Sequence, residues 1–325
     1  MPSVCQRIAS LLCALLFLTP LSVLAQDYPN KPIRLIVPYA AGGAGDIAFR
    51  LISGAVEEKL GQRFVIENKP GASGNIGAAE VARAAPDGYT LLLGGGNNFT
   101  SNQFLYKNMG FDPIAVFDQI ALISNSPTVV GVVPGVPVNT LRELAAYAKA
   151  NPGKLNFGSP GVGTPPRLSA ELFAALADVK MVHIPFNGSP AVMLALQQEL
   201  VQLAFYTMGP VLALIRGGKL KPLAVASTSR LEALPGVPTS AEAGFPELLT
   251  GSWQGIAAPR GTDPIILDKI NAAVRAALAD QAVRKRFADM GAIPGDMSRG
   301  QLTAFVREEA ARWKRVVDAA GIQPE

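Results

Sequence analysis

Residues 34–46 read RLIVPYAAGGAGD, and the fold can be worked out from this stretch. The apolar run Ile33 to Val37 is typical of a buried strand, and the glycines after it break the strand. A helical pattern then covers residues 47–60, with Leu51, Ile52, Val56 and Leu60 on one face. A strand that ends in glycines and leads into a helix presents free N–H groups at the turn, which suit a negatively charged group.

Strand and helix patterns alternate along residues 31–293, which predicts an α/β protein, and the length of 325 residues predicts about two domains. The first set has the order β-α-β-α-β, with strands at 33–37, 64–67 and 90–93 and a second helix at 75–85. A second set begins near Val129, with strands at 155–158, 181–185, 201–206 and 222–226. Its helices begin at Thr140, Thr164 and Ser189, and later helices begin after Asp263 and at Ser298, behind a strand at 252–258. The expected fold is two doubly wound α/β domains.

The first 25 residues have the pattern of a secretory signal peptide. Arg7 precedes an apolar run from Ile8 to Leu18, and small residues before Ala25 suit cleavage there. Both cysteines, Cys5 and Cys13, lie in this segment, so the mature chain is expected to have no disulfide, thiol nucleophile or cysteine metal site. Without Arg7, 28 of the 29 basic residues remain against 25 acidic ones, and their scattered positions do not indicate nucleic-acid binding.

Catalytic motifs are absent from the sequence. His183 is the single histidine, no G-x-S-x-G or H-E-x-x-H motif occurs, and one histidine without cysteines is a poor transition-metal set. A histidine between Val182 and Ile184 is most often structural. We therefore expect no enzyme activity, no cofactor and no metal.

The turn from strand to helix start recurs at three places: residues 42–46, residues 159–165 and residues 187–190. In a doubly wound sheet such turns lie at the carboxyl edge, where ligands bind, and the helix dipole there favours anions. Basic residues are few at these turns, chiefly Arg50 and Arg167. Neutral N–H, hydroxyl and amide donors suit a small carboxylate better than a polyphosphate. Asn97, Asn98 and Thr100, after a run of glycines, are candidates for the far wall of the site.

A dinucleotide site is the alternative interpretation of the first turn. Residues 43–48 match G-x-G-x-x-A, and Glu67 follows about 20 residues later, where such sites place an acidic residue. Asp46 would repel a pyrophosphate, however, and an exported protein has no free nicotinamide pool. The missing Gly-Lys-Ser/Thr excludes a P-loop. An exported NAD-binding enzyme therefore stays open as the second hypothesis.

The chain resembles the Bug family, the extracytoplasmic receptors of tripartite tricarboxylate transporters, over residues 28–322. The segments that carry this resemblance are YPNKPIRLIVPYAAGGAGD, ENKPGASGNIGAAEVARAAPDGYTLLLG, FGSPGVGTPPRLSAELF, IPFNGSPAVMLAL, ASTSRLEALPGVPTSAEAGFPEL and GIAAPRGTDPIILDKIN. The resemblance implies a two-domain venus-flytrap fold of the type II periplasmic-binding-protein kind. Domain 1 would hold residues 26–126 and 252–325 and domain 2 residues 127–251, joined by crossover strands near 124–128 and 249–253.

The resemblance also implies the ligand and the residues that bind it. A small carboxylate would be held between the first turn, residues 39–46, and a second turn, residues 159–164, with an aromatic-x-Gly turn nearby. Carried over, the ligand-binding residues are Tyr39, Ala41, Gly42, Gly43, Asp46, Asn97, Ser159, Gly161, Gly163, Thr164, Phe186 and Asn187. Two positions depart from the family pattern: Arg167 stands where histidine is common, and Tyr39 where phenylalanine is common.

The implied partners are the integral-membrane subunits of a transporter, and the implied location is the periplasm. The receptor would act as a monomer and would bind no nucleic acid. The same receptor could instead present its closed form to a membrane signalling protein, and its sequence does not separate these two uses.

Overall fold

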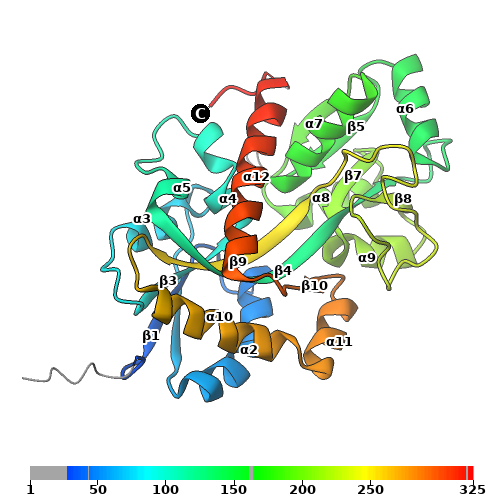
Figure 1. The fold of residues 1–325 in the computed structure, drawn as a ribbon. Helices are drawn as coiled ribbons and strands as arrows, with labels where there is room; N and C mark the ends of the chain where they lie inside the picture. Colours follow the sequence, from blue (N-terminus) through cyan, green and yellow to red (C-terminus); the bar gives the residue numbers. More distant parts are fainter. Residues whose placement is uncertain (1–27, 43, 161–163, 320, 325) are drawn as a thin grey trace, which may run out of the picture.

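The computed structural model describes residues 28–42, 44–160, 164–319 and 321–324. The expected signal peptide and the glycines at 43, 161 and 163 lie outside these ranges. The described residues form a ten-stranded sheet in the order β2-β1-β3-β9-β4-β7-β5-β6, with β8 and β10 also paired to β4 (Figure 1). The strands are β1 Ile33–Val37, β2 Phe64–Asn68, β3 Thr90–Gly95, β4 Phe117–Val132, β5 Asn156–Ser159, β6 Val182–Pro185, β7 Leu203–Thr207, β8 Lys221–Val225, β9 Gly251–Pro259 and β10 Ile293–Pro294.

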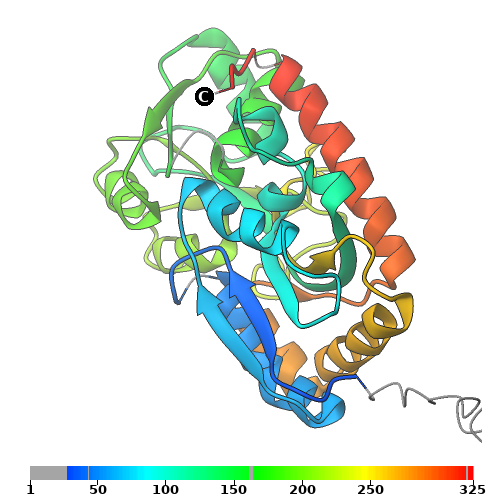
Figure 2. The same ribbon diagram turned by 90° about the vertical axis from the view of Figure 1, so that its left-hand side faces the viewer.

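Helices cover both faces of this curled sheet (Figures 1 and 2). The α-helices of the described residues are α2 Ala44–Leu60, α3 Asn75–Ala82, α4 Gly96–Phe99, α5 Pro113–Val116, α6 Leu141–Ala150, α7 Pro165–Ala177, α8 Ser189–Gln197, α9 Met208–Arg216, α10 Pro264–Leu278, α11 Gln281–Asp289 and α12 Arg299–Ala319. Short 3₁₀ turns occur at Ala72–Gly74 and Asn102–Phe104.

The first half of the sheet holds β1, β2 and β3 in parallel, with β9 antiparallel to β3. Side chains alternate across it, as the two-residue period of a strand requires. Leu91 and Leu93 face a core shared with α2 and α10, whereas Leu92 faces a core shared with α3 and α12. This half therefore has buried apolar cores on both faces, as the alternating sequence pattern predicted.

The second half of the sheet holds β5, β6 and β7 in parallel order beside the end of β4. Its core includes Phe157 of β5, Phe173 of α7 and Phe205 of β7, all with almost no exposed surface. The parallel strands β5 and β7 both end at the edge where α7 and α9 begin. The helix starts of this half consequently lie at one sheet edge, as do those of the first half.

β4 is a single 16-residue strand that belongs to both halves. It pairs with β9 as far as Pro127 and with β7 from Thr128 onward. The chain returns at Thr250, which hydrogen-bonds with Thr128 and Ala226 before β9 begins. Local residue patterns did not indicate a strand here, because Ser124, Asn125, Ser126 and Pro127 have the composition of a turn, whereas the family resemblance implied a crossover strand near 124–128. Pro127 is tolerated because it lies opposite Gly251, at the end of the ladder with β9.

α12 contacts both halves of the molecule and runs along one side of it (Figure 2). Ser298 and Gln301 form the expected capping box, with the Ser298 N–H donating to Gln301 Oε1 at 2.9 Å. Leu302 and Val306 join the core of the first half, whereas Trp313, Val316, Val317 and Ile322 join the core of the second. The boundaries at 126/127 and 251/252 stay predictions.

The predicted start of α6 is confirmed, with one difference. Thr140 Oγ1 accepts a hydrogen bond from the Glu143 N–H at 3.1 Å, as a capping box requires. The return bond to Glu143 Oε2 comes from the N–H of Asn139 at 2.7 Å and not from Thr140. Asp263 caps α10 as predicted, since Oδ1 accepts from the Ile265 N–H at 2.8 Å.

Candidate ligand-binding site

The first turn is closed by its own acidic residue. Asp46, in the first turn of α2, is 3% exposed, and its Oδ2 accepts the Gly42 N–H at 2.9 Å. Arg50 Nε contacts the other oxygen, Oδ1, at 3.0 Å. Burial alone would raise the pKa of Asp46, but the hydrogen bonds from Arg50 and Gly42 outweigh it and lower this pKa below its usual value. Asp46 thus stays ionised and holds the turn, with Ala41 and Gly42 exposed at its tip.

Tyr39 links the first turn to the end of β3. Its hydroxyl lies 2.7 Å from Oδ1 of both Asn97 and Asn98 and can donate its one proton to either. Burial raises the pKa of the Tyr39 hydroxyl above its usual range, so this donor stays protonated. Tyrosine at this position therefore supplies a structural hydrogen bond that phenylalanine could not make. The Asn68 amide donates to the Tyr39 carbonyl at 3.0 Å and fixes the backbone on the other side.

A cluster of four asparagines, Asn75, Asn97, Asn98 and Asn102, lies behind Tyr39. Amide groups of three of them donate to the single carbonyl of Ser73, from Asn97 at 2.9 Å, Asn98 at 3.0 Å and Asn102 at 3.2 Å. Ser73 has a positive φ of 53°, which is strained for a residue with a side chain. We call these residues the asparagine cluster, and it holds the 72–75 turn against the end of β3.

The second turn leads into α7, with Thr164 as the N-cap and Pro165 in the first turn, as predicted. Ser159, at the end of β5, is fully buried, and its hydroxyl lies 2.6 Å from His183 Nε2 of β6. Burial and, to a lesser extent, the charge of Arg167 lower the pKa of His183 to about 4. The imidazole is therefore neutral near pH 7 and can accept the Ser159 proton, which orients this hydroxyl. This agrees with the structural role expected for His183.

Arg167 is only partly engaged by the chain. Its side chain is 18% exposed, and its Nε lies 3.6 Å from Glu171 Oε1, beyond hydrogen-bond distance. That Nε is buried and has no hydrogen-bond partner among the described residues. Glu171 lies one helical turn further along α7, and burial raises its pKa despite the attraction of Arg167. The guanidinium near the start of α7 is thus a positive charge that its neighbour neutralises weakly.

The third turn joins β6 to α8. Phe186 is half-buried, and its N–H donates to the Ser159 carbonyl at 2.9 Å, which ties this turn to the second one. A Cβ on Gly158 would lie 3.1 Å from the Phe186 ring, so glycine there gives the ring room. Asn187 is exposed, and Gly188 has a φ of 92° immediately before α8. The structure thus brings the second and third turns together.

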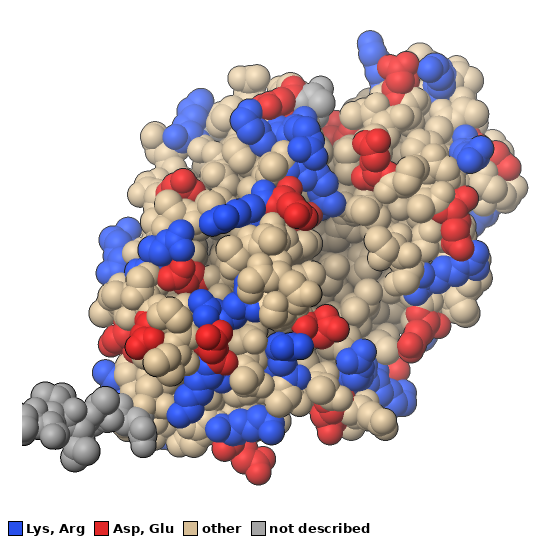
Figure 3. All heavy atoms as spheres, viewed as in Figure 1, with Lys and Arg blue, Asp and Glu red and all other residues tan. Residues whose placement is uncertain are grey.

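Two of the cavities among the described residues lie beside the crossover strands β4 and β9, where the halves of the sheet meet. One of about 20 Å³ has Asn97 on one side and Pro165 and Leu168 of α7 on the other, above Trp253. This volume is about the size of one water. Asn97 of the asparagine cluster and the start of α7 therefore face one another across a narrow gap. Figure 3 shows the molecule hollowed between its two lobes, with basic and acidic side chains interspersed around the hollow.

The second cavity, of about 220 Å³, adjoins the first turn. Its polar lining comes from Ser124 and Ser126 of β4, Thr207 at the start of α9, and Ser252 and Gln254 of β9. Ile47 and Ala48 of α2, Pro210, Met290 and Ala292 form the apolar lining. We call this space the crossover cavity, because β4 and β9 carry the chain between the two halves.

The sequence pointed to Asn97 and Asn98 of the asparagine cluster, but not to Asn75, Asn102 or the crossover cavity. Thr207-Met208-Gly209-Pro210 follows a strand and starts a helix, much as Thr164-Pro165 does, and that pattern could have indicated a further turn at the cleft. Gln254 lies within an apolar strand and carries no such signal. Its position follows from the antiparallel pairing of β9 with β3 and β4, which single-strand patterns do not show.

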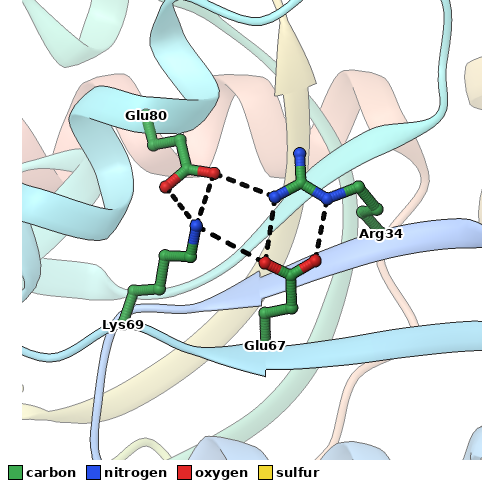
Figure 4. Close-up of polar contacts among 4 residues, drawn as sticks. All are labelled: Arg34, Glu67, Lys69 and Glu80. Carbon is green, nitrogen blue, oxygen red and sulfur yellow. Dashed lines mark hydrogen bonds and ion pairs between the residues drawn. The ribbon is translucent and has the colours of Figure 1, made fainter.

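Glu67 does not have the free carboxylate that a dinucleotide site needs. Arg34 Nε and Nη2 donate to both of its oxygens, at 2.8 and 2.9 Å, and Lys69 Nζ lies 3.4 Å from Oε2 (Figure 4). Glu80 of α3 completes the group, 2.6 Å from Lys69. The bonds from Arg34 lower the pKa of Glu67 to about 2. This ion-pair group fastens α3 to β1 and β2, and it occupies the residue that would bind a ribose.

Within the described ranges, no group of histidine, cysteine and carboxylate side chains is arranged to hold a metal ion. No helix in those ranges is long and apolar enough to cross a membrane.

The neutral histidine gives a pH dependence of stability that can be measured. The folded pKa of about 4 lies below the ordinary 6.5, so below pH 6.5 the unfolded chain binds a proton that the folded chain rejects. This contribution to stability is complete above pH 6.5 and is lost as the pH falls toward 4. We expect the wild type to lose about 1 kcal/mol more than His183→Gln between pH 7.5 and pH 5 in urea unfolding, after allowance for partial exposure. Equal losses in the two proteins would contradict the assigned neutral state.

Comparison with known proteins identifies the family. Residues 48–322 match the model of the tripartite tricarboxylate transporter family receptor. A Bordetella pertussis protein of the UPF0065 group is 36% identical over 323 residues, which covers 99% of each chain. The R. palustris protein Rpa4515, solved with adipate, is 35% identical with a TM-score of 0.80, over 92% of this chain and all of that one. The periplasmic binding protein BugD is 33% identical with a TM-score of 0.76, at the same coverage.

These relatives confirm the predicted fold, two doubly wound α/β halves of the periplasmic-binding-protein type with two crossover strands. They also decide between the two classes of function left open by the sequence, since members of this family are receptors for solutes and not enzymes. The chain belongs to the tripartite tricarboxylate transporter receptors, the periplasmic solute-binding proteins of the Bug group.

Proposed function

We propose that this receptor captures a small carboxylate in the cleft between its two domains and delivers it to the membrane subunits of a tripartite tricarboxylate-type transporter. The observation that carries the proposal is the set of helix starts on opposite sides of the cleft. α2 begins in the first domain, and α7 and α8 begin in the second, each behind a strand end. Backbone N–H groups at helix starts stabilise a carboxylate without a full positive charge.

The neutral donors around these helix starts favour a carboxylate of small size. Tyr39 and Asn97 line one side, while Ser159, Thr164, Phe186 and Asn187 belong to the turns of the other. The glycines at 42, 43, 161 and 163 would let the ligand approach the backbone closely. A relative with 35% identity was solved with adipate, which is consistent with this ligand class.

Delivery would depend on closure of the two domains, residues 26–126 with 252–325 and residues 127–251, about the crossovers near 124–128 and 249–253. The ligand stabilises the closed form because it contacts helix starts in both domains at once. The receptor would be exported to the periplasm, with its signal peptide cleaved after about Ala25, and it would present its closed form to the transporter as a monomer.

A thermal unfolding panel tests this function. A carboxylate present at 100 times its Kd should stabilise the folded receptor by about 2.7 kcal/mol, which raises Tm by several degrees. The panel should include mono-, di- and tricarboxylates, each with its neutral amide as the matched control. If no acid raises Tm above its amide, the proposal fails.

A further inference from the structure

Gln254 lies where the crossover cavity meets the first turn and the end of β3. Its Oε1 lies 2.8 Å from the position that a Cβ on Gly45 would take and 3.5 Å from the corresponding position on Gly95. The carboxamide therefore sits between the first turn and the end of β3, against two backbones that have no side chains. A ligand held by the first turn would therefore lie close to it.

The Gln254 carboxamide is buried and incompletely hydrogen-bonded. The residue is 7% exposed, and Oε1 has no hydrogen-bond partner among the described residues. Its Nε2 makes one long contact, 3.4 Å to Ser252 Oγ. Buried polar atoms normally have partners, because leaving one unpaired costs about 1–3 kcal/mol. A ligand hydroxyl suits this group, since it can both donate and accept and so meets either end of the carboxamide.

The charge of the cavity argues against a second carboxylate at this place. None of the described residues that line it is charged: the polar lining consists of Ser124, Ser126, Thr207, Ser252 and Gln254. The start of α9 adds backbone donors there, but Pro210 removes one N–H from its first turn. An ionised carboxylate that loses its water needs a cation or several donors in exchange, whereas a hydroxyl needs only one neutral partner.

The rest of the cavity lining is apolar and incompletely covered. Ile47 is a large hydrophobic residue that is 44% exposed, and Pro210 and Met290 lie at the same cavity. The volume of about 220 Å³ would hold about seven waters at roughly 30 Å³ each, or a short methylene chain in their place. A partly apolar body with one hydroxyl therefore matches both the polar and the apolar part of the lining.

We propose that the crossover cavity is the subsite for an uncharged, hydroxyl-bearing body of the ligand, and that Gln254 is the residue that selects it. This inference rests on the carboxylate-receptor function and narrows it, from carboxylates in general to hydroxy monocarboxylates. The ligand carboxylate lies at the helix starts, and the hydroxyl reaches the Gln254 carboxamide.

Three acids of matched chain length test the proposal by calorimetric titration of the full mature chain: 4-hydroxybutyrate, pentanoate and succinate. They end in a hydroxyl, a methyl and a carboxylate. We expect 4-hydroxybutyrate to bind about fivefold or more tighter than pentanoate, as one net hydrogen bond allows, and at least tenfold tighter than succinate. Succinate binding that equals or exceeds that of 4-hydroxybutyrate would overturn the subsite and leave the receptor function standing.

Gln254→Leu keeps a similar side-chain volume and removes the carboxamide. The ratio of the affinities for 4-hydroxybutyrate and pentanoate should therefore fall to about 1. Gln119→Leu is the matched control, because Gln119 is also buried, on β4, with an unpartnered Oε1, but does not line this cavity. The control should keep the wild-type ratio. An unchanged ratio in Gln254→Leu would overturn the role of Gln254. If no acid of this trio or of the wider panel binds, the receptor function itself is overturned.

Discussion

Asn98→Ala is expected to lower the free energy of unfolding by about 3 kcal/mol, the largest loss among the substitutions considered. Asn98 has no exposed surface, and its Oδ1 accepts the Gly95 N–H at 3.1 Å while lying within reach of the Tyr39 hydroxyl. Its amide donates to the Ser73 carbonyl. Removal of this side chain leaves several buried groups unpaired in a network whose members support one another. Urea unfolding at pH 7 measures the loss.

Asn98→Asp separates hydrogen bonding from volume in this network, and Asn108→Ala is the control outside it. Asn98→Asp keeps the volume and the acceptor oxygens, but its ionised form cannot donate to Ser73, so it should also be clearly destabilised. Asn108 is exposed, and Asn108→Ala should change stability by less than about 0.5 kcal/mol. Near-wild-type stability of Asn98→Asp would show that the donor to Ser73 contributes little.

Asp46→Ala is expected to cost about 2 kcal/mol of stability and to weaken carboxylate binding at least tenfold. The buried carboxylate holds the Gly42 N–H and Arg50, so its loss frees the turn that presents N–H groups to the ligand. Asp87→Ala is the control, because Asp87 is an exposed turn residue whose Oδ1 accepts the Tyr89 N–H. Calorimetric titration with the acid that gives the largest Tm shift compares the three proteins. Equal affinities for the two variants would remove Asp46 from the site.

Asp46→Asn distinguishes a residue that holds the turn from one that touches the ligand. Asparagine can still accept the Gly42 N–H through Oδ1, and it removes a negative charge near the bound carboxylate. We therefore expect Asp46→Asn to retain most of the binding that Asp46→Ala loses. Loss of binding in both variants would instead indicate that the ion pair of Asp46 with Arg50 is needed to hold the turn.

Local rules were sufficient to predict the parts of this fold that depend on neighbours in sequence. β1 has the predicted bounds, and Thr140, Asp263 and Ser298 begin helices as their capping chemistry requires. Local patterns did not indicate β4, because its turn-like residues 124–127 are held extended by pairing with β9, more than 120 positions away in the chain. Only the family resemblance implied a crossover strand there. Propensity yields to such tertiary contacts.

The same distinction applies to the candidate site: local patterns predicted several of its residues, but not the long-range contacts that these residues make. Tyr39 and Asn97 were both predicted, but the hydrogen bond between them joins residues 58 positions apart and could not be read from either segment. Asp46 was predicted from its place in the glycine turn, yet only the structure shows that its oxygens are directed to Gly42 and Arg50. Gln254 carries no local signal, and its importance arises from the two glycine backbones packed against it.

α12 restricts how such a receptor can open. The helix is anchored in both cores, through Leu302 and Val306 at one end and Trp313, Val316 and Val317 at the other. Lobes that separated on this side would expose those apolar side chains to water, whereas rotation about the helix leaves them packed. We therefore expect α12 to lie on the hinge side of the receptor. The two halves can rotate about it, the cleft widens on the side away from α12, and solute enters and leaves there.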